Sequence, residues 1–386
     1  MTHPPLRVGV MGCGNISDTY LKNASLWRHI EFVACADLSV EAAQRKADIY
    51  DLKAMSVAEM IAADDVDIVL NLTIPSAHAD VSIAALEAGK HVYTEKPLAA
   101  HFADGQRILK AARKAGRRVG SAPDTVLGPG FQTGRAIHDS GQMGEVITGL
   151  AAVLSRGMEH WHPNPSFFFQ QGGGPVLDLG PYYLAALVSI LGPVRRVQAS
   201  GRIGRAKRLV TGEGPMKGQT VPVETFTTLN ALLSFEGGAE ITFLASWDVP
   251  HSDLRPIELH GTNGTLRLPD PNMFGGTVAF AEVGGTFDVT STSEQPFGAD
   301  NRLWMEKFPY TCYRGLGLAD MARALQAGED FRCSEDFSLH VLEVLFAIED
   351  AAQNGRGVEL TTTCTRPTAM AFEQARDLLA KQADIV

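Results

Sequence analysis

A glycine-rich turn near the N-terminus constrains the fold of this chain most strongly. The residues Gly12-Cys13-Gly14-Asn15-Ile16-Ser17 follow a short apolar run at 6–11, which is typical of a buried parallel strand. Gly12 permits a tight turn, and Gly14 lets the backbone approach a pyrophosphate at the start of the next helix. Such a motif can be a plain turn, but here it follows a strand and opens a helix. We therefore predict a dinucleotide-binding unit, with Asn15 and Ile16 among its contacts.

An acidic residue follows the second predicted strand. This strand covers residues 30–36, and Asp37 stands at its end. A carboxylate there can accept hydrogen bonds from both ribose hydroxyls and would repel a 2′-phosphate. The sequence therefore predicts NAD rather than NADP, although a solvated strand-end aspartate is the alternative. Ser17 replaces the third glycine of the fingerprint and is still a small residue.

Strands and helices alternate through the rest of the first third. We expect strands at 66–72, 91–93 and 118–120, and helices at 19–27, 77–88 (capped by Ser76) and 103–115 (ended by Gly116). This alternation predicts an α/β fold with a doubly wound parallel sheet, whose ligands bind beyond the carboxyl ends of the strands. The further residues expected at that edge are Thr73, Pro75, His78, Glu95 and Lys96.

Lys96 is the first candidate catalytic residue. A lysine at a strand end is usually a surface charge, but Pro97 confines this one to extended backbone conformations. It also lies at the predicted ligand edge. We expect Lys96 to face a substrate bound against the dinucleotide.

The pattern changes from about residue 125. Longer strands appear around hairpin turns, at 226–235 and 239–247 about Glu236-Gly237-Gly238, and again about Thr262-Asn263-Gly264. They predict an α+β domain with a mostly antiparallel sheet. We predict domains at 1–124 and 125–386, with late helices at 335–354 and 367–383 that pack on the second domain or return to the first.

Three glycines precede the next candidate residues. After Gly172-Gly173-Gly174 we expect a helix to about residue 191, on which Asp178 and Tyr182 share one face because they are four apart. Asp178 could instead cap the helix, but Pro181 lacks the N–H that such a cap would bind. The alternative for Tyr182 is a buried tyrosine that bonds Asp178.

An aromatic loop precedes those glycines. His160, Trp161 and His162 could bind a sugar through ring faces and imidazole hydrogen bonds, or the loop could pack at a subunit interface. No further ligands are spaced with the two histidines, so we expect no metal site.

Composition excludes several partners. The net charge of −10 argues against nucleic acid. We expect neither a signal peptide nor a membrane span, since no apolar run approaches about 18 residues. Five scattered cysteines suit free thiols in a reducing cytoplasm.

The glycine turn, Glu95-Lys96-Pro97 and residues 172–180 together resemble the glucose–fructose oxidoreductase, inositol dehydrogenase and rhizopine-catabolism (Gfo/Idh/MocA) family. The resemblance covers nearly the whole chain. It implies a Rossmann domain joined to a domain with a large open sheet, whose face often forms homodimers or homotetramers. It also implies NAD(P)-linked oxidation of a hydroxyl on a sugar or cyclitol.

The resemblance also implies roles for single residues. Lys96 matches the family's catalytic lysine, and its bond to Pro97 is often cis there. Many members carry histidine where this chain has Tyr182, whereas glucose–fructose oxidoreductase is similar in having a tyrosine that acts as acid and base. Ala185 replaces an acid common in the family, which departs from inositol-type contacts.

Three functions follow as hypotheses. The first is an NAD-dependent dehydrogenase of a carbohydrate or cyclitol, in which Tyr182 takes the hydroxyl proton, Lys96 stabilises the oxygen and Asp178 orients the substrate. His162 is the rival proton carrier. The second is an enzyme that uses tightly held NAD transiently for elimination or glycoside cleavage. The third is a dinucleotide-binding regulator, which would not require Lys96 or Asp178.

Overall fold

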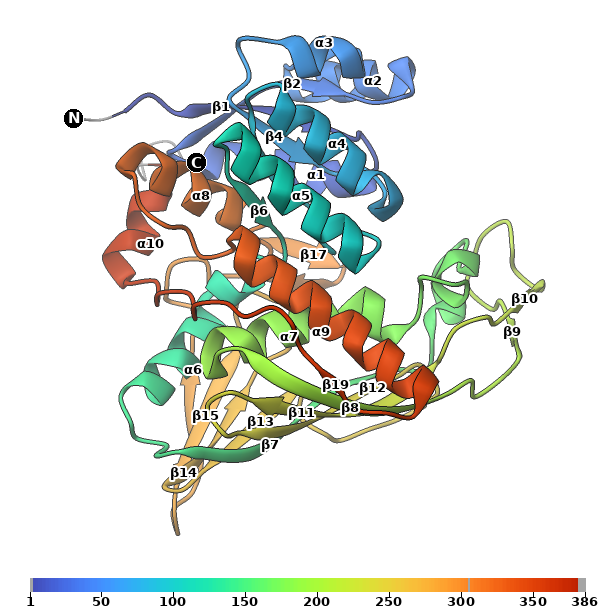
Figure 1. Cartoon of the computed structure of the whole chain (residues 1–386), viewed down its shortest axis with the longest axis vertical. Helices are drawn as coiled ribbons and strands as arrows, with labels where there is room; N and C mark the ends of the chain where they lie inside the picture. The colour runs from blue at the N-terminus through green and yellow to red at the C-terminus, as the bar shows by residue number, and fades with distance from the viewer. Residues whose placement is uncertain (1–2, 305, 381–386) are drawn as a thin grey trace.

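The computed structural model describes residues 3–304 and 306–380, and its first part is a parallel sheet (Figure 1). Six strands lie in the order β3-β2-β1-β4-β5-β6. Their order reverses direction between β1 and β4, where the ligand crevice of such sheets lies. The predicted doubly wound sheet is confirmed. The strands are β1 (Leu6–Met11), β2 (Ile30–Ala36), β3 (Lys53–Met55), β4 (Ile68–Asn71), β5 (His91–Thr94) and β6 (Val119–Ser121).

Helices connect these strands. α5 shows why they form: its buried residues Ile108, Leu109 and Ala112 share one face, and Gly116 ends it at φ 62°. The helices are α1 (Asn15–Leu21), α2 (Val40–Tyr50), α3 (Val57–Ala62), α4 (Pro75–Glu87) and α5 (Phe102–Ala115).

Two expected helices differ in the structure. The expected helix at 19–27 is wrong: α1 starts directly after the glycine turn, and a separate 3₁₀ turn η1 (Ala24–Leu26) follows it. Ser76 is not a cap, because α4 begins one residue earlier at Pro75. Proline is favoured at that first position, where a helix does not use the backbone N–H.

The second part is built on a nine-stranded sheet with the order β16-β15-β14-β13-β7-β12-β11-β8-β19. Its neighbours are antiparallel except for β7 and β12, so the expected mostly antiparallel sheet is confirmed. The two predicted hairpins join β11 to β12 and β13 to β14. Its strands are β7 (Val146–Leu154), β8 (Val194–Arg202), β11 (Thr228–Phe235), β12 (Glu240–Ser246), β13 (Ile257–Gly261), β14 (Gly264–Leu268), β15 (Thr277–Glu282), β16 (Asp288–Ser291) and β19 (Val358–Glu359).

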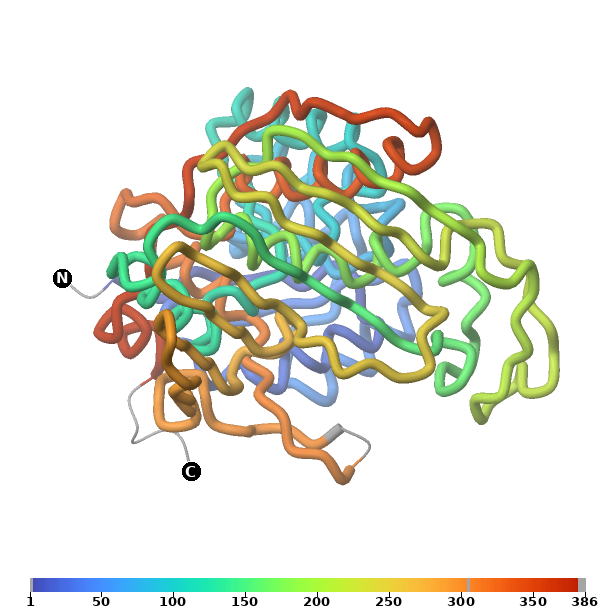
Figure 2. Tube along the Cα trace, turned by 90° about the horizontal axis from the view of Figure 1, so that it is seen from below, coloured from blue at the N-terminus to red at the C-terminus, as the bar shows by residue number. Residues whose placement is uncertain are grey.

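Two long helices cover one face of this sheet. α7 (Pro175–Leu191) is buried on all sides from Gly180 to Ile190, because it lies between the sheet and α9 (Glu335–Asn354). α9 also packs on α5 of the first part, so it joins the two sheets (Figure 1). Figure 2, seen from below, looks onto the strands on the opposite face.

Smaller elements complete the chain. α6 (Pro129–Asp139) follows the 3₁₀ turn η2 (Thr125–Leu127), and α8 (Leu316–Ala327) precedes α9. A side lobe carries β9 (Lys207–Leu209), β10 (Thr220–Pro222), η3 (Met158–His160) and η4 (Ser166–Phe169), and a separate hairpin pairs β17 (Arg302–Trp304) with β18 (Phe308–Tyr310).

The last helix returns to the first sheet. α10 (Phe372–Leu378) is shorter than the expected helix at 367–383, whose last three residues lie outside the described part. The chain leaves the helix because Leu379 turns extended and bridges Trp27, and the carbonyl of Leu378 accepts the N–H of Arg28. Within the described residues, no helix is long and apolar enough to cross a bilayer.

Candidate active site

The glycine turn leaves room for a ligand at one position only. Gly12 has φ 102°, and a Cβ there would lie 2.7 Å from the backbone of Leu72, so glycine is required for the fold. A Cβ on Gly14 would meet no atom within 4 Å. The buried Ser17 hydroxyl donates to the Gly14 carbonyl over 2.7 Å, so this small residue serves where the fingerprint has glycine. The space beside Gly14, at the first residues of α1, is therefore open to a ligand.

Asp37 fastens this turn. Its Oδ2 accepts the backbone N–H of Cys13 over 2.7 Å, and its Oδ1 accepts that of Ser39 over 2.9 Å. Each carboxylate oxygen has a second acceptor site. Asp37 can therefore hold the turn and still accept hydrogen bonds from a ribose.

His78 supports the ligand edge from behind. Its buried ring lies between the carbonyls of Pro97 (2.8 Å from Nδ1) and Thr73 (3.0 Å from Nε2), and burial lowers its pKa. The Thr73 hydroxyl donates to Asn71 Oδ1 over 2.7 Å. These contacts tie the turn before Pro75 to the loop after β5. The predicted cofactor contacts of Thr73, Pro75 and His78 stay predictions.

Glu95 and Lys96 follow β5 at the same edge. The buried Glu95 accepts the hydroxyl of Tyr20 and the backbone N–H of Lys96, each over 2.8 Å. The Lys96–Pro97 bond is cis. The Lys96 ammonium donates to the Asp178 carbonyl over 2.7 Å and lies 3.3 Å from its Oδ1. The lysine of the first sheet thus meets the start of α7.

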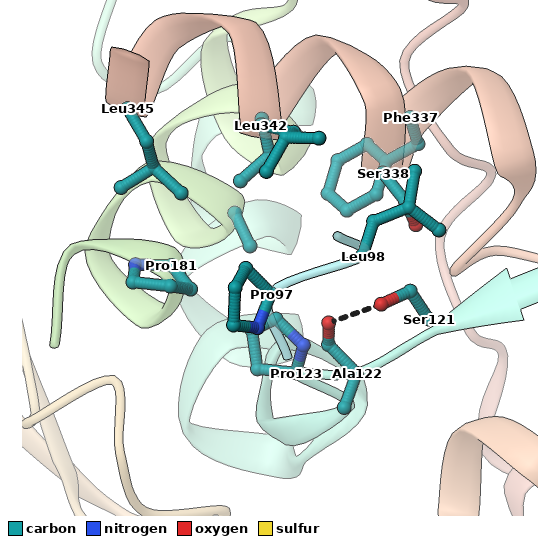
Figure 3. A pocket seen from close by; sticks show the side chains of 12 residues that line it. Pro97, Leu98, Ser121, Ala122, Pro123, Pro181, Phe337, Ser338, Leu342 and Leu345 are labelled. Atoms are coloured by element: carbon teal, nitrogen blue, oxygen red, sulfur yellow. Dashed lines mark hydrogen bonds between the residues drawn. The ribbon is translucent and has the colours of Figure 1, made fainter. Parts of the chain in front are cut away.

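An apolar layer supports the Lys96 loop (Figure 3). Pro97 and Leu98 face Pro181 on α7 and Leu342 and Leu345 on α9 across a small cavity. These side chains come from both parts of the chain. Their packing fixes the direction from which the lysine reaches α7.

Tyr182 lies on the same face of α7 as Asp178. The helix begins at Pro175, after Gly174, so Asp178 lies within its first turn and is not its cap. The Lys96 ammonium sits 5.2 Å from the centre of the Tyr182 ring. The phenol oxygen accepts a hydrogen bond from Arg314 over 2.8 Å, and no bond joins it to Asp178 among the described residues.

Lys96 keeps its charge in this setting. Burial works against the ammonium, but Tyr182, Asp178 and Glu95 outweigh it, and the pKa of Lys96 is raised above its ordinary value. Its side chain is 18% exposed, and that of Asp178 is 24% exposed. A cation that is fixed but still reachable can donate to an oxygen that gains negative charge.

Arg314 is a site residue that the sequence analysis did not predict. It is buried just before α8, with Nη1 3.8 Å from Oδ1 of the buried Asp124. Burial lowers the pKa of the guanidinium, but Tyr182, Glu95 and Asp124 raise it well above its ordinary value. The available signal was a single arginine in Tyr313-Arg314-Gly315, next to the apolar residues with which α8 begins.

The predicted substrate residues of the aromatic loop lie in the side lobe. His160 Nδ1 is 2.7 Å from the Thr211 hydroxyl, and the His162 ring stands edge-on to Trp161, with centroids 5.3 Å apart. Trp161 is 49% exposed. Within the described part of the chain, no hydrogen bond or ring contact joins this loop to Lys96 or Tyr182. The structure therefore does not bring the two groups of predicted residues into contact.

The side lobe is nevertheless connected to α7. The N–H of Gly174 donates to the Phe168 carbonyl over 2.8 Å, four residues before Asp178. Inside the lobe, the buried Arg208 pairs with the buried Glu159 at 2.9 Å. An internal ion pair and a backbone bond thus hold the aromatic loop beside the first turn of α7.

Two consecutive segments of the chain match models of known protein families. Residues 6–122 match the oxidoreductase family with an NAD-binding Rossmann fold, and residues 131–267 match the GFO/IDH/MocA C-terminal domain. Among solved structures, an NAD binding oxidoreductase from Klebsiella pneumoniae superposes with a TM-score of 0.79 at 23% identity, covering 93% of this chain and all of that one. At this identity the likeness shows the fold.

Two curated relatives are also similar. Inositol 2-dehydrogenase from Salmonella typhimurium is 35% identical over 152 residues, which are 37% of this chain and only 44% of that protein. dTDP-3,4-didehydro-2,6-dideoxy-α-D-glucose 3-reductase from Streptomyces violaceoruber is 30% identical over 269 residues, which are 68% of this chain and 72% of the relative. With both family segments and a relative matched over most of its length, the chain belongs to the Gfo/Idh/MocA family of oxidoreductases with an NAD-binding Rossmann fold.

Proposed function

We propose that this protein is an NAD-dependent dehydrogenase that acts on a hydroxyl carbon of a sugar, sugar derivative or cyclitol. The observation that carries the proposal is the meeting of Lys96, Asp178 and Tyr182 at the ligand edge of the dinucleotide-binding sheet. A fixed cation, a carboxylate and a phenol are the groups that alcohol oxidation requires.

Each of these groups has a proposed role. Lys96 donates to the substrate oxygen and stabilises its negative charge, and Asp178 orients both the lysine and the substrate. Tyr182 takes the hydroxyl proton. When bound, the nicotinamide supplies the acceptor for the hydride that leaves the same substrate carbon. The remaining cofactor contacts are assigned to Gly12, Gly14, Asn15, Ile16, Asp37, Thr73, Pro75, His78 and Glu95.

The substrate class rests on chemistry and on relatives. The two curated relatives are named as an inositol 2-dehydrogenase and as a 3-reductase of a dTDP-linked glucose derivative. In this chain, the exposed Trp161 offers a ring face for C–H groups, and His160 and His162 offer polar ring atoms. The side lobe is therefore the proposed substrate side.

We propose NAD rather than NADP because of Asp37. A 2′-phosphate would meet this carboxylate, and the next residue, Leu38, is an exposed apolar side chain. Asp37→Ala should reduce the preference for NAD, measured as the ratio of kcat/KM for the two cofactors. Equal values for both cofactors in the unaltered enzyme would contradict the assignment.

Three further proposals concern the whole chain. The division into domains at 1–124 and 125–386 is supported by the end of the first sheet at Ser121 and the start of the second at Val146. A homodimer or homotetramer is supported by the face of the second sheet opposite α7 and α9. A reducing, cytoplasmic setting is supported by five free cysteines.

The decisive experiment is a panel of sugars, lactones and cyclitols with NAD⁺, followed by NADH absorbance. Accumulation of NADH with one class supports the dehydrogenase, whereas product without net NADH supports transient use of held cofactor. Lys96→Ala serves as the variant: it should bind dinucleotide nearly normally and lose roughly 10²-fold or more in kcat. Retention of more than about a tenth of kcat would make Lys96 a structural residue.

A further inference from the structure

Arg314 lies directly against the phenol of Tyr182. Its Nη2 donates to the phenol oxygen over 2.8 Å and lies 3.3 Å from Oδ1 of Asn272. The guanidinium also stands 5.3 Å from the centre of the Tyr182 ring, and the residue is 8% exposed. Arginine has only N–H donors, so the phenol oxygen must be the acceptor in this contact.

We propose that Arg314 is a positioning residue for the proton transfer of Tyr182, a role that rests on the proposed function. Because Arg314 occupies an acceptor site of the phenol oxygen, the O–H of Tyr182 must point elsewhere. Among the described residues, none accepts that O–H. That side of the phenol oxygen is therefore left for the substrate hydroxyl. In oxidation, Tyr182 accepts the hydroxyl proton there as a phenolate held by the guanidinium, and in the reverse direction it returns that proton to the substrate oxygen.

The backbone around Arg314 is fixed from both sides. Asn23 Nδ2 donates to the carbonyl of Arg314 over 3.1 Å. Oδ2 of Asp124 accepts the N–H groups of Gly315 and Gly317 over 3.0 and 3.1 Å. These bonds come from the first sheet's side of the molecule. They hold the backbone from which the Arg314 side chain extends, independently of Tyr182.

Asp124 supports the arginine without competing for its contact. Its Oδ1 lies 3.8 Å from Nη1, which is too long for a direct hydrogen bond but close enough to offset the buried positive charge. The direct hydrogen bond of the guanidinium is therefore made to the phenol of Tyr182. Such a geometry favours a role at Tyr182 over a simple buried ion pair.

Two cations lie against Tyr182, each with a carboxylate near it. The Lys96 ammonium lies 5.2 Å from the ring centre and 3.3 Å from Asp178, and the Arg314 guanidinium contacts the phenol oxygen and lies 3.8 Å from Asp124. The charged and titratable groups on the packed elements are Lys96 after β5, Asp178 on α7 and Arg314 before α8, with Asp124, Glu95 and Tyr20 around Arg314.

The first test needs no substrate. Tyrosinate absorbance is titrated in the wild type and in Arg314→Gln, each against its Tyr182→Phe counterpart, so that the difference reports Tyr182 alone. We expect the Tyr182 signal to appear at a pH higher by about one unit or more in Arg314→Gln, a tenfold change or more in the ionisation equilibrium. The same pH in both backgrounds would overturn the proposal, even if no sugar is ever found to be a substrate.

The second test uses turnover once a substrate is known. Arg314→Gln should lower kcat by roughly 10²-fold and move the rise of the pH–rate profile to higher pH, whereas Arg314→Lys keeps the charge and should lose about tenfold or less. In a Tyr182→Phe background, both effects should vanish, because Arg314 acts through the phenol.

A structural role would give a different pattern. Arg314→Gln or Arg314→Lys would then lower kcat equally with and without the Tyr182 hydroxyl, and the profile would not move. Circular dichroism and thermal unfolding check that each variant folds. If Arg314→Gln does not fold, Arg314→Lys takes its place in the titration and in the comparison of double variants. The Tyr182 signal should then move to higher pH by a smaller amount. An unchanged pH would overturn the proposal.

Discussion

Lys96 follows a strand of the first sheet, whereas Tyr182 lies on the helix α7 that covers the second sheet. The Lys96 ammonium lies 5.2 Å from the centre of the Tyr182 ring, with Asp178 beside it. Two further buried charges lie next to them: Glu95 accepts the hydroxyl of Tyr20, and Arg314 donates to the phenol of Tyr182. The arrangement resists rearrangement, because any partner removed would leave a buried charge unmatched.

Gly14 and Gly12 form a matched pair for testing the dinucleotide site. Gly14→Ala should leave the free energy of unfolding nearly unchanged, because its Cβ meets no atom within 4 Å. It should weaken NAD⁺ binding by about tenfold or more, since that Cβ fills the space left for the pyrophosphate.

Gly12→Ala should behave in the opposite way. Its φ of 102° and the 2.7 Å approach to the Leu72 backbone should destabilise the fold by about 1–3 kcal/mol. For both variants, urea unfolding measures the loss of stability and calorimetric titration measures the loss of NAD⁺ affinity. Unchanged NAD⁺ affinity in Gly14→Ala would place the pyrophosphate elsewhere.

Tyr182→Phe tests the proposed proton carrier. The change keeps ring packing and removes only the hydroxyl, so kcat should fall about 10²- to 10⁴-fold while the KM for cofactor stays similar. His162→Ala is the comparison, because His162 was the rival. Near-normal kcat for Tyr182→Phe, with the pH profile altered only in His162→Ala, would transfer the role to the histidine.

At the scale of elements, α9 joins the two sheets and carries a carboxyl with an unusual titration. Glu349 has a buried Oε1 without a hydrogen-bond partner among the described residues. Burial raises the pKa of this carboxyl to about 7. The folded protein therefore holds this proton at a pH where the unfolded chain has released it.

The sign of the effect on stability follows directly. The contribution of the bound Glu349 proton to the free energy of unfolding is full below the unfolded pKa of about 4.5. It is lost as the pH rises through the folded pKa of about 7. Glu349→Gln should raise the free energy of unfolding near pH 8 by up to about 3 kcal/mol, with little gain near pH 4.5.

Urea unfolding at the two pH values measures the gain in Glu349→Gln. Asp350→Asn, a change at the exposed neighbour on the same helix, is the control and should show no such pH-dependent gain. An equal gain at both pH values would mean that a change in packing, and not titration, explains the result.

At the scale of the whole molecule, α7 and α9 cover only one face of the second sheet. On the opposite face, Leu232 of β11 is 38% exposed and pairs in register with Thr242 of β12. We expect this face to form the contact between copies of the chain. Light scattering of the wild type should give a multiple of 41.5 kDa.

Leu232→Arg tests that contact. The substitution places a charge on the open face and should shift the mass towards that of one chain. Ile49→Arg is the control, because Ile49 is an exposed residue of α2 in the first part. This change should leave the mass measured by light scattering unchanged. A wild type that has the mass of a single chain would refute the proposed assembly.

Local patterns in the sequence predict most of the helices and strands. The strand at 30–36, the helix at 335–354 and both hairpins were predicted within a few residues, because hydrophobic period and glycine turns act over short distances. The sequence also determined that Asp178 and Tyr182 share a helix face, since that depends only on spacing. The predicted ends of three helices were wrong. A 3₁₀ turn follows α1, α4 begins at a proline, and a β-bridge to Trp27 follows α10.

Which charged side chains come into contact depends on the packing of the whole chain. The 5.2 Å contact of Lys96 with Tyr182, the hydrogen bond from Arg314 and the separation of the aromatic loop depend on how the two sheets pack through α7 and α9. Nothing in the local sequence around Arg314 indicates its partner, because that partner lies far away in the chain on another element. Burial in a packed interior then sets the strength of these electrostatic contacts, and burial is a property of the whole fold.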